Sequence, residues 1–125
     1  MEIVTINPGL ILGPNIIDGS FTSSLVIKRL MSGKIPGAAK LMFGIVDVRD
    51  VALAHLQAIK IKGAANQRFL LVNESLWIKQ IMAILKEEFG KHYVIPDGEI
   101  RYITFRLASM FDASLKLALP FWDKK

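Results

Sequence analysis

The chain has 125 residues, of which 52% are hydrophobic and 22% charged, and its formal net charge is +5 at pH 7. This composition excludes a disordered chain and fits one folded domain or a part of one. The absence of cysteine excludes disulfides and thiolate metal sites, and with only two histidines we expect no metal site.

The basic residues are scattered along the chain, and no run of them is interleaved with aromatic residues. Nucleic acid is therefore not expected as a partner, although the same charge would suit an anionic substrate or a phosphate-bearing cofactor. No apolar stretch reaches the roughly 18 residues that cross a bilayer, so a membrane is not expected as a partner. The N-terminus has no secretory signal pattern, and we expect the protein in the cytoplasm.

The sequence VTINPGLILGP at residues 4–14 predicts the first strand. Residues 3–7 and 10–12 are rich in strand formers, with an Asn-Pro-Gly interruption between them and a Gly-Pro stop after them. A loop with two turn signals continues to residue 20. We expect a buried strand with an extension, and in open α/β sheets ligands bind where such strands end.

Two helices are predicted in the middle of the chain, on either side of a short β-rich stretch at 41–48. Thr22 or Ser23 would cap the first helix, which runs to about residue 32. Asp50 would cap the second helix, from residue 51 to about 61. The inward-facing residues would be Leu25, Val26, Leu30 and Met31 in the first helix, and Ala52, Leu56 and Ile59 in the second.

The rest of the chain predicts a buried strand at 68–72 and helices at 76–89 and 102–118. The helix at 76–89 is amphipathic, with Ser75 as its cap and Gly90 at its end. Its apolar face comprises Ile78, Ile81, Met82, Leu85 and Phe89. Strands that alternate with helices indicate an α/β architecture with a parallel strand pair.

Two segments in combination carry a resemblance to a known family. INPGLILGP at 6–14 and VDVRDVALAH at 46–55 resemble the extended short-chain dehydrogenase/reductase family, and in particular its NAD-dependent epimerase/dehydratase, dihydroflavonol-reductase-like branch. There, a strand ending in Asn-Pro-x-x-x-x-Gly-Pro follows the catalytic helix, and Val-Asp-Val-x-Asp-Val-Ala-x-Ala-His returns the chain beneath the substrate pocket. The resemblance continues through RFLLVNES and covers about residues 3–95.

The resemblance implies an α/β fold class, the C-terminal part of a doubly wound (Rossmann-type) parallel sheet with a small helical substrate-side layer, incomplete on its own. Strands 3–7 and 68–72 would be parallel neighbours. Residues 1–125 would form a single partial domain. In it, 1–74 would be the end of the dinucleotide-binding sheet with the substrate-pocket loop, and 75–125 the helical C-terminal layer.

The resemblance also implies a site for NADP or NAD and a small-molecule substrate. Pro8 and Gly9 would lie where the backbone closes over the nicotinamide ring, since proline has no N–H and glycine allows a close approach. Ser23, beside Thr22, would reach the ribose or phosphates of the cofactor. Asn15 and Phe21 would belong to the wall of the substrate pocket.

Two features of the family are absent from the sequence. The glycines make no dinucleotide fingerprint, and no tyrosine is followed four residues later by lysine, since Tyr93 is followed by Asp97 and Tyr102 by Arg106. We therefore assign no catalytic residue. The expected function is that of a fragment resembling an NAD(P)-dependent oxidoreductase that reduces a carbonyl or oxidises an alcohol, inactive alone and with little cofactor binding of its own.

Other interpretations of the same residues are structural. Asp50 is interpreted as a helix cap, Asp47 as a partner of Arg49 or of another basic neighbour, and His55 as a core histidine. The alternative function is a non-enzymatic interaction module or an assembly subunit, with the missing half of the fold or another subunit as partner. The helix within 101–119 is apolar nearly all round, so it would be buried, or would contact a partner or a membrane surface.

Overall fold

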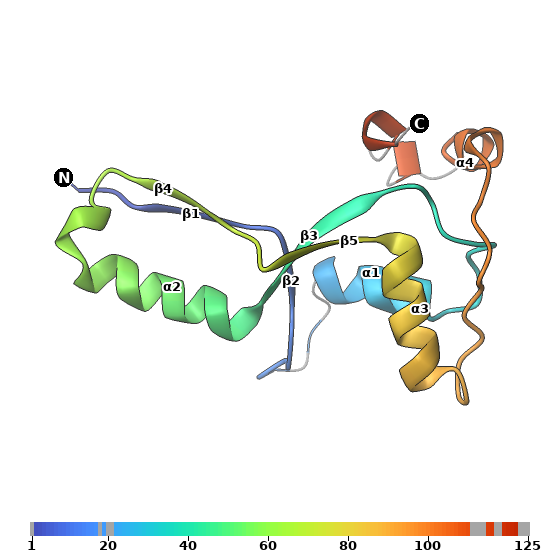
Figure 1. The fold of residues 1–125 in the computed structure, drawn as a ribbon, viewed down its shortest axis with the longest axis horizontal. Coiled ribbons are helices and arrows are strands. Elements are labelled where there is room, and N and C mark those ends of the chain that lie inside the picture. Colours follow the sequence, from blue (N-terminus) through green and yellow to red (C-terminus); the bar gives the residue numbers. More distant parts are fainter. Residues whose placement is uncertain (1, 18, 20–21, 111–114, 117–118, 123–125) are drawn as a thin grey trace. The chain divides into compact units, whose positions relative to one another are not determined.

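The computed structural model describes residues 2–17, 19, 22–110, 115–116 and 119–122 (Figure 1). The chain forms two compact units. The first unit comprises Met1–Ser24 and Phe43–Ser75, and the second comprises Leu25–Met42 and Leu76–Lys125.

A pair of parallel strands forms one part of the first unit. Strand β1 (Thr5–Pro8) lies beside β4 (Arg68–Leu71), in a register that matches Thr5 with Arg68 and Pro8 with Leu71. Helix α2 (Val48–Lys60) runs along this pair and is followed by the short 3-10 helix η1 (Lys62–Ala64) (Figure 1). The predicted parallel pairing is confirmed.

A second sheet has the strand order β2-β3-β5. Strand β2 (Leu10–Leu12) pairs in parallel with β3 (Met42–Asp47), and β5 (Glu74–Trp77) lies on the other side of β3. The predicted first strand and its extension thus enter two different sheets. Strand β5 was not predicted, because its short sequence ESLW has no clear alternation of apolar and polar residues.

Helix α2 differs from its prediction at its start and on its faces. Asp47, and not Asp50, is the N-cap, and its side chain accepts a hydrogen bond from the Arg49 backbone N–H. The residues predicted to face inward are exposed instead. Ala52 and Leu56 are both exposed, and the exposed fraction of Ile59 is 84%. Val51 is the buried residue of the helix. Strand β4 is also more exposed than predicted, since the exposed fraction of Leu70 is 76%.

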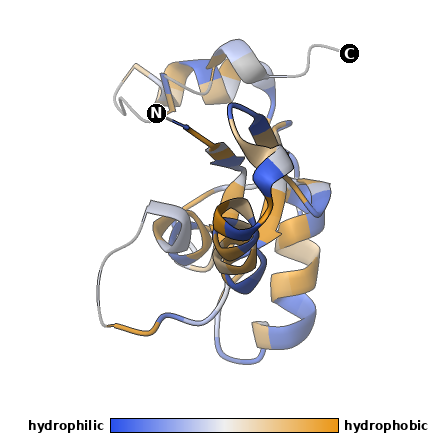
Figure 2. Cartoon of the chain, turned by 90° about the vertical axis from the view of Figure 1, so that its left-hand side faces the viewer, coloured by the Kyte–Doolittle hydropathy of each residue, from blue (hydrophilic) through white to orange (hydrophobic). Residues whose placement is uncertain are grey.

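The second unit is helical. Helix α1 (Thr22–Leu30) begins in the first unit and ends two residues earlier than predicted, with Leu30 buried and Leu25 exposed. Helix α3 (Ile78–Phe89) confirms the amphipathic prediction for Ile78, Ile81 and Met82, which are buried, and ends at Gly90 as expected. Figure 2 shows the mixture of hydrophobic and hydrophilic residues along the helices. Trp77 occupies the N-cap position predicted for Ser75.

Helix α4 (Tyr102–Ala108) is shorter than the predicted helix. At its C-cap, the Ser109 hydroxyl donates to the Arg106 carbonyl at 2.7 Å. Of its apolar residues, Ile103 and Leu107 are exposed, as is Met110 beyond its end, while Phe105 is 2% exposed and packs on Trp122 with ring centroids 4.8 Å apart. Residues 111–114 and 117–118 lie outside the described residues. The 3-10 helix η2 (Leu119–Phe121) follows.

Backbone and charged contacts connect the segment between α1 and β3, and helix α3, to the segment that precedes α4. Ala38 N–H donates to the Gly98 carbonyl at 2.7 Å, and Ile100 N–H donates to the Ala38 carbonyl at 3.0 Å. Lys79 pairs with Glu99 at 2.9 Å, and Lys86 pairs with Asp97. Within the described part of the chain, no helix is long and apolar enough to span a membrane, and no cluster of metal-binding side chains is present.

Candidate functional site at the carboxyl ends of the strands

The candidate site lies where β1 ends, within the first unit. Pro8 is the last residue of β1, and the Gly9 N–H donates to the Leu71 carbonyl at 3.0 Å. Both residues are half-buried. The site is formed locally by a proline that brings no N–H to the strand end and a glycine at which the chain leaves the ladder.

Asn7 contributes the least expected feature of this region. Its side-chain Oδ1 accepts a hydrogen bond from Arg68 Nη2 at 3.4 Å, whereas its Nδ2 is buried without a hydrogen-bond partner. Buried polar groups are nearly always hydrogen-bonded, so this unpaired donor sets Asn7 apart from the other polar groups of the strand. No role of its own was predicted for Asn7, although its place in the Asn-Pro-Gly interruption was a signal.

The missing side chain of Gly9 is already explained by the packing of the chain. A Cβ at Gly9 would lie 2.3 Å from the Gly44 carbonyl oxygen and 3.4 Å from the Val72 side chain. Only glycine therefore allows the chain to pass this close to β3 as it moves from one sheet to the other. The approach of the Gly9 backbone to a nicotinamide ring remains a prediction.

The end of β2 lies against the start of α2. Gly13 has a φ of 139°, and a Cβ there would lie 2.7 Å from a Val48 methyl group. Asp47, which caps α2, accepts hydrogen bonds through Oδ1 from the backbone N–H of Arg49 at 2.8 Å and from its Nε at 2.9 Å. Its Oδ2 accepts from Arg49 Nη2 at 2.6 Å.

The Asp47–Arg49 pair fixes the charge of this carboxylate. Hydrogen bonds from the Arg49 side chain, and then from its backbone N–H, lower the pKa of Asp47 from 3.8 to about 2. Asp47 therefore stays ionised at neutral pH and does not serve as a proton donor there. The predicted pairing with Arg49 is confirmed, and its role in the structure is to begin the helix.

The other predicted site residues belong to the segment that follows β2. Ser23 is the second residue of α1 and is half-buried, and Asn15 is exposed in the loop after β2. Phe21 lies outside the described residues. The structure thus places Pro8 and Gly9 together at one strand end, and Asn15 and Ser23 in the segment that follows β2.

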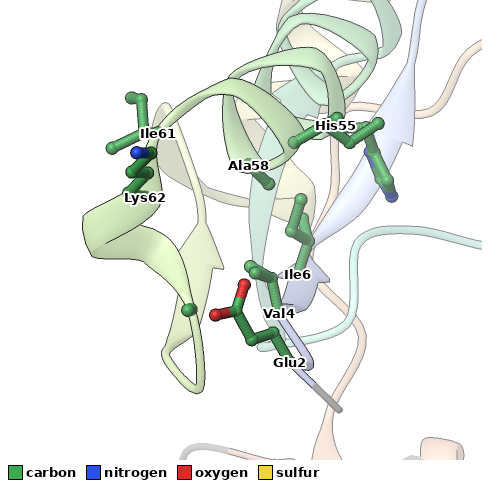
Figure 3. Close-up of a pocket in the computed structure, with 9 residues that line it drawn as sticks. Glu2, Val4, Ile6, His55, Ala58, Ile61 and Lys62 are labelled. Carbon is green, nitrogen blue, oxygen red and sulfur yellow. The ribbon is translucent and has the colours of Figure 1, made fainter.

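A separate hollow of about 440 Å³ lies on the face of β1 that α2 covers (Figure 3). Ile6 lines it from β1 and Val4 from just before that strand, and His55, Ala58 and Ile59 line it from the helix. His55 is exposed, and its Nδ1 lies 2.7 Å from the Val51 carbonyl oxygen, so the interpretation as a core histidine is wrong. None of the predicted site residues lines this hollow.

Parallel strands, a helix along them, and an unpaired polar group at a strand end define part of an α/β sheet of the ligand-binding kind. Comparisons with known proteins show which α/β proteins the chain is similar to. The chain is 32% identical over 97 residues to an NADPH-dependent methylglyoxal reductase of Saccharomyces cerevisiae, covering 70% of this chain and 28% of the relative. It is 35% identical over 89 residues to a cinnamoyl-CoA reductase of Medicago truncatula, covering 70% of this chain and 26% of the relative.

The solved structures agree with these relatives. The yeast methylglyoxal/isovaleraldehyde reductase Gre2, in complex with NADPH, matches with a TM-score of 0.65 and 32% identity, covering 78% of this chain and 30% of that one. No family model matches the chain. The chain spans less than a third of the length of the curated relatives named above.

These matches confirm two expectations from the sequence. The resemblance to the extended short-chain dehydrogenase/reductase family is confirmed, because the similar proteins are reductases that the chain matches over part of their length. The fold class is confirmed too, since the chain is an α/β structure that matches part of a Rossmann-type reductase. NADPH is the cofactor bound in the yeast structure, and NADP(H) is therefore a cofactor of this family.

Proposed function

We propose that this chain is the substrate-side portion of an NADPH-dependent reductase that acts on a carbonyl group of a small organic molecule. The observation that carries the proposal is the match to a reductase solved with NADPH, at 32% identity and a TM-score of 0.65. Residues 1–74 would then contribute the end of the dinucleotide-binding sheet, and residues 75–125 the helical layer beside the substrate. We propose the cytoplasm as its location.

The residues at the end of β1 fit a nicotinamide cofactor. The unpaired Nδ2 donor of Asn7 is available to an acceptor, and Pro8 presents no N–H to the ring. Gly9 would contribute only backbone, because the space of its side chain is already taken by Gly44. When bound, the cofactor would supply a hydride to the carbonyl carbon.

The segment after β2 would complete the binding surface. The Ser23 hydroxyl, at the start of α1, would reach the ribose or phosphates of the cofactor. Asn15 and Phe21 would form part of the substrate-pocket wall, as the family resemblance implies. In this proposal the residues of the chain bind and orient, and none of them transfers the proton.

We expect the chain alone to be inactive. Reduction of a carbonyl needs a proton donor of tuned pKa near the oxygen, and the sequence has no Tyr-x-x-x-Lys pair to supply it. The alternative, an interaction module or assembly subunit derived from the family, shares one requirement with this proposal. In both, the chain works with another part of the fold or with another subunit.

A chimera tests the proposal. The matching part of the yeast methylglyoxal reductase is replaced by this chain, and carbonyl-dependent loss of NADPH absorbance is compared for the chimera and for the chain alone. We expect turnover only in the chimera. A chimera that folds but neither binds NADPH nor reduces methylglyoxal or cinnamoyl-type carbonyls would contradict the proposal, as would turnover by the chain alone.

A variant of Asn7 tests the site within the chimera. Asn7→Ala removes the unpaired donor, and we expect the Kd for NADPH to rise about tenfold, equivalent to about 1.4 kcal/mol. Asn73→Ala is the matched control, since Asn73 is exposed in the same unit. Equal affinities of the two variants would show that Asn7 does not contact the ligand.

A further inference from the structure

Asp97 is followed directly by Gly98 in irregular backbone of the second unit, between α3 and α4. Both residues are exposed, and the side chain of Asp97 keeps 70% of its accessible surface. A Cβ at Gly98 would meet nothing within 4 Å, so the space beside this residue is open. No hydrogen bond from the Gly98 N–H is present among the described residues. An exposed carboxyl group therefore stands next to an unpaired and unshielded backbone nitrogen.

The backbone after Asp97 is held by close contacts. The Gly98 carbonyl accepts a hydrogen bond from the Ala38 N–H at 2.7 Å, and the Ile100 N–H donates to the Ala38 carbonyl at 3.0 Å. A Cβ at Gly37 would lie 2.5 Å from the Gly98 carbonyl oxygen, so the two segments lie against each other. These contacts fix the carbonyl side of Gly98 but not its N–H side.

The Asp97 carboxylate has one ion-pair partner in the part of the chain that the structure describes. The Lys86 ammonium, on helix α3, donates to Oδ2 of this carboxylate. Exposed ion pairs of this kind contribute little to stability. The pair therefore restrains the rotation of the carboxyl group toward the Gly98 nitrogen only weakly.

We propose that Asp97 is a site of spontaneous isoaspartate formation. The Gly98 nitrogen attacks Cγ of the protonated Asp97 carboxyl group, so that an N–Cγ bond forms and a Cγ–O bond breaks. The amide proton and the carboxyl hydroxyl leave as water, and a cyclic succinimide remains. Water then adds to a ring carbonyl: addition at Cγ restores aspartate, and addition at the backbone carbonyl gives isoaspartate. The reaction needs only these two residues and water, so it is independent of the proposed function.

The isoaspartyl linkage changes the second unit locally. It adds a methylene group to the main chain before Gly98 and leaves a carboxylate directly on Cα of residue 97. Because the Gly98 carbonyl is held against Ala38, the longer main chain displaces the backbone on the other side, toward Ile95, which is 5% exposed. The carboxylate is also moved away from Lys86. We therefore expect the modified chain to have a lower thermal midpoint.

Peptide mapping of the folded chain tests the inference. The chain is kept at neutral pH and physiological temperature and then cut with trypsin, which releases Asp97 in the peptide of residues 92–101. Isoaspartate leaves the mass of this peptide unchanged, alters its elution, and prevents cleavage by endoproteinase Asp-N. We expect it to form at a rate no more than about tenfold below that of the free synthetic peptide, because an exposed segment opens at little cost. A larger suppression in the folded chain would overturn the inference.

A second aspartate of the chain, Asp18, also precedes a glycine and lies outside the described residues. It belongs to the tryptic peptide of residues 1–28, so its conversion is measured separately and does not enter the rate at Asp97.

Variants of two lysines on α3 show whether the reaction takes place in the folded chain. Lys86→Gln removes the pair with Asp97 and should raise the rate about two- to fivefold. Lys79→Gln removes the similar pair with Glu99 and is the matched control, which should leave the rate unchanged. Equal rates in the two variants would overturn the inference, because Asp97 would then react from the unfolded chain, where neither pair exists.

A variant of Gly98 removes the reaction without disturbing the fold. Gly98→Ala shields the nitrogen and should lower the rate roughly tenfold. Its own stability should not change, because the added Cβ meets nothing within 4 Å and the φ of Gly98 is not positive. On ageing, the thermal midpoint should therefore fall in the unaltered chain and much less in Gly98→Ala. An unchanged rate in Gly98→Ala would overturn the inference, and an equal fall of the two midpoints would overturn the effect on the second unit.

Discussion

The two units of this chain have very different interiors. Among the described residues, the buried apolar side chains of the first unit are Val46, Val51 and Ala64. Those of the second unit are Leu30, Ala38, Ala39, Leu41, Ile78, Ile81, Met82, Ile95, Phe105 and Trp122. The second unit has the longer list of buried apolar side chains, although both units leave some exposed: Leu70 and Ile59 in the first, Val94 and Met110 in the second. Hydrophobic burial is the main favourable term in folding, so we expect the second unit to be the more stable of the two.

A pair of phenylalanine variants gives the largest expected contrast. Phe105→Ala empties a fully buried site in the second unit and should cost about 3–5 kcal/mol. Phe69→Ala in the first unit removes a side chain that is exposed, and should cost about 1 kcal/mol or less. Urea unfolding followed by circular dichroism measures both costs, whereas tryptophan fluorescence reports the second unit, where Trp122 contacts Phe105. Similar costs would mean that the first unit has a core of its own.

Glycine variants compare close backbone packing in the two units. A Cβ at Gly9 would lie 2.3 Å from the Gly44 carbonyl oxygen, and one at Gly37 would lie 2.5 Å from the Gly98 carbonyl oxygen. We expect Gly9→Ala and Gly37→Ala each to cost roughly 1–3 kcal/mol, as overpacking does. Gly63→Ala, with nothing within 4 Å, is the control and should be neutral or slightly stabilising.

The close contact between Gly9 and Gly44 also decides whether a Gly9 variant tests cofactor affinity or stability. The sequence alone suggests that Gly9→Val would lower cofactor affinity more than stability. The contact with Gly44 shows instead that stability must fall first, because the added side chain meets backbone that has little freedom to move. Asn7 is therefore the better probe of cofactor binding, and Gly9 the better probe of the first unit's packing.

The pH dependence of stability distinguishes the first unit through Asp47. Because its folded pKa is lowered from 3.8 to about 2, the pair with Arg49 stabilises the fold fully above pH 3.8 and is lost as the pH falls toward 2. Asp47→Asn should lower the thermal midpoint at neutral pH and flatten its change across this window. Asp50→Asn, in the same first turn, is the control. An unchanged pH profile for Asp47→Asn would contradict this prediction.

The smallest expected effect belongs to the ion pair of the second unit. Lys79 and Glu99 are 2.9 Å apart and largely exposed, and the hydrogen bond from Lys79 lowers the pKa of Glu99. Such exposed pairs contribute little and are screened by salt. Lys79→Ala should lower the thermal midpoint slightly at low ionic strength and leave it unchanged at high ionic strength. Lys91→Ala should leave the thermal midpoint unchanged at both ionic strengths. A decrease that salt leaves unchanged would point to lost packing.

The sequence by itself determined the architecture and the family resemblance. The alternation of strands and helices and the amphipathic helix near 76–89 are set by apolar periodicity, which acts over a few residues. The pairing of the parallel neighbours at 3–7 and 68–72 was implied by the family resemblance. The resemblance depended on two short segments, residues 6–14 and 46–55. Their residue types follow from local requirements, because a strand ends in a turn in the first and a helix begins in the second. Gly90 ends α3 for the same local reason.

The tertiary structure alone decided which apolar faces are covered and which polar groups are paired. Leu56 and Ile59 have the spacing of a buried stripe and are exposed, because the described residues provide nothing to cover them. Asp47 takes the capping role expected of Asp50 because β3 ends there, and a cap must stand where the helix begins. The unpaired Nδ2 of Asn7 could not be read from its residue type, since hydrogen bonding depends on the segments that pack around it. Periodicity tells where an apolar face lies along a segment, but only the packing of distant segments decides what meets it.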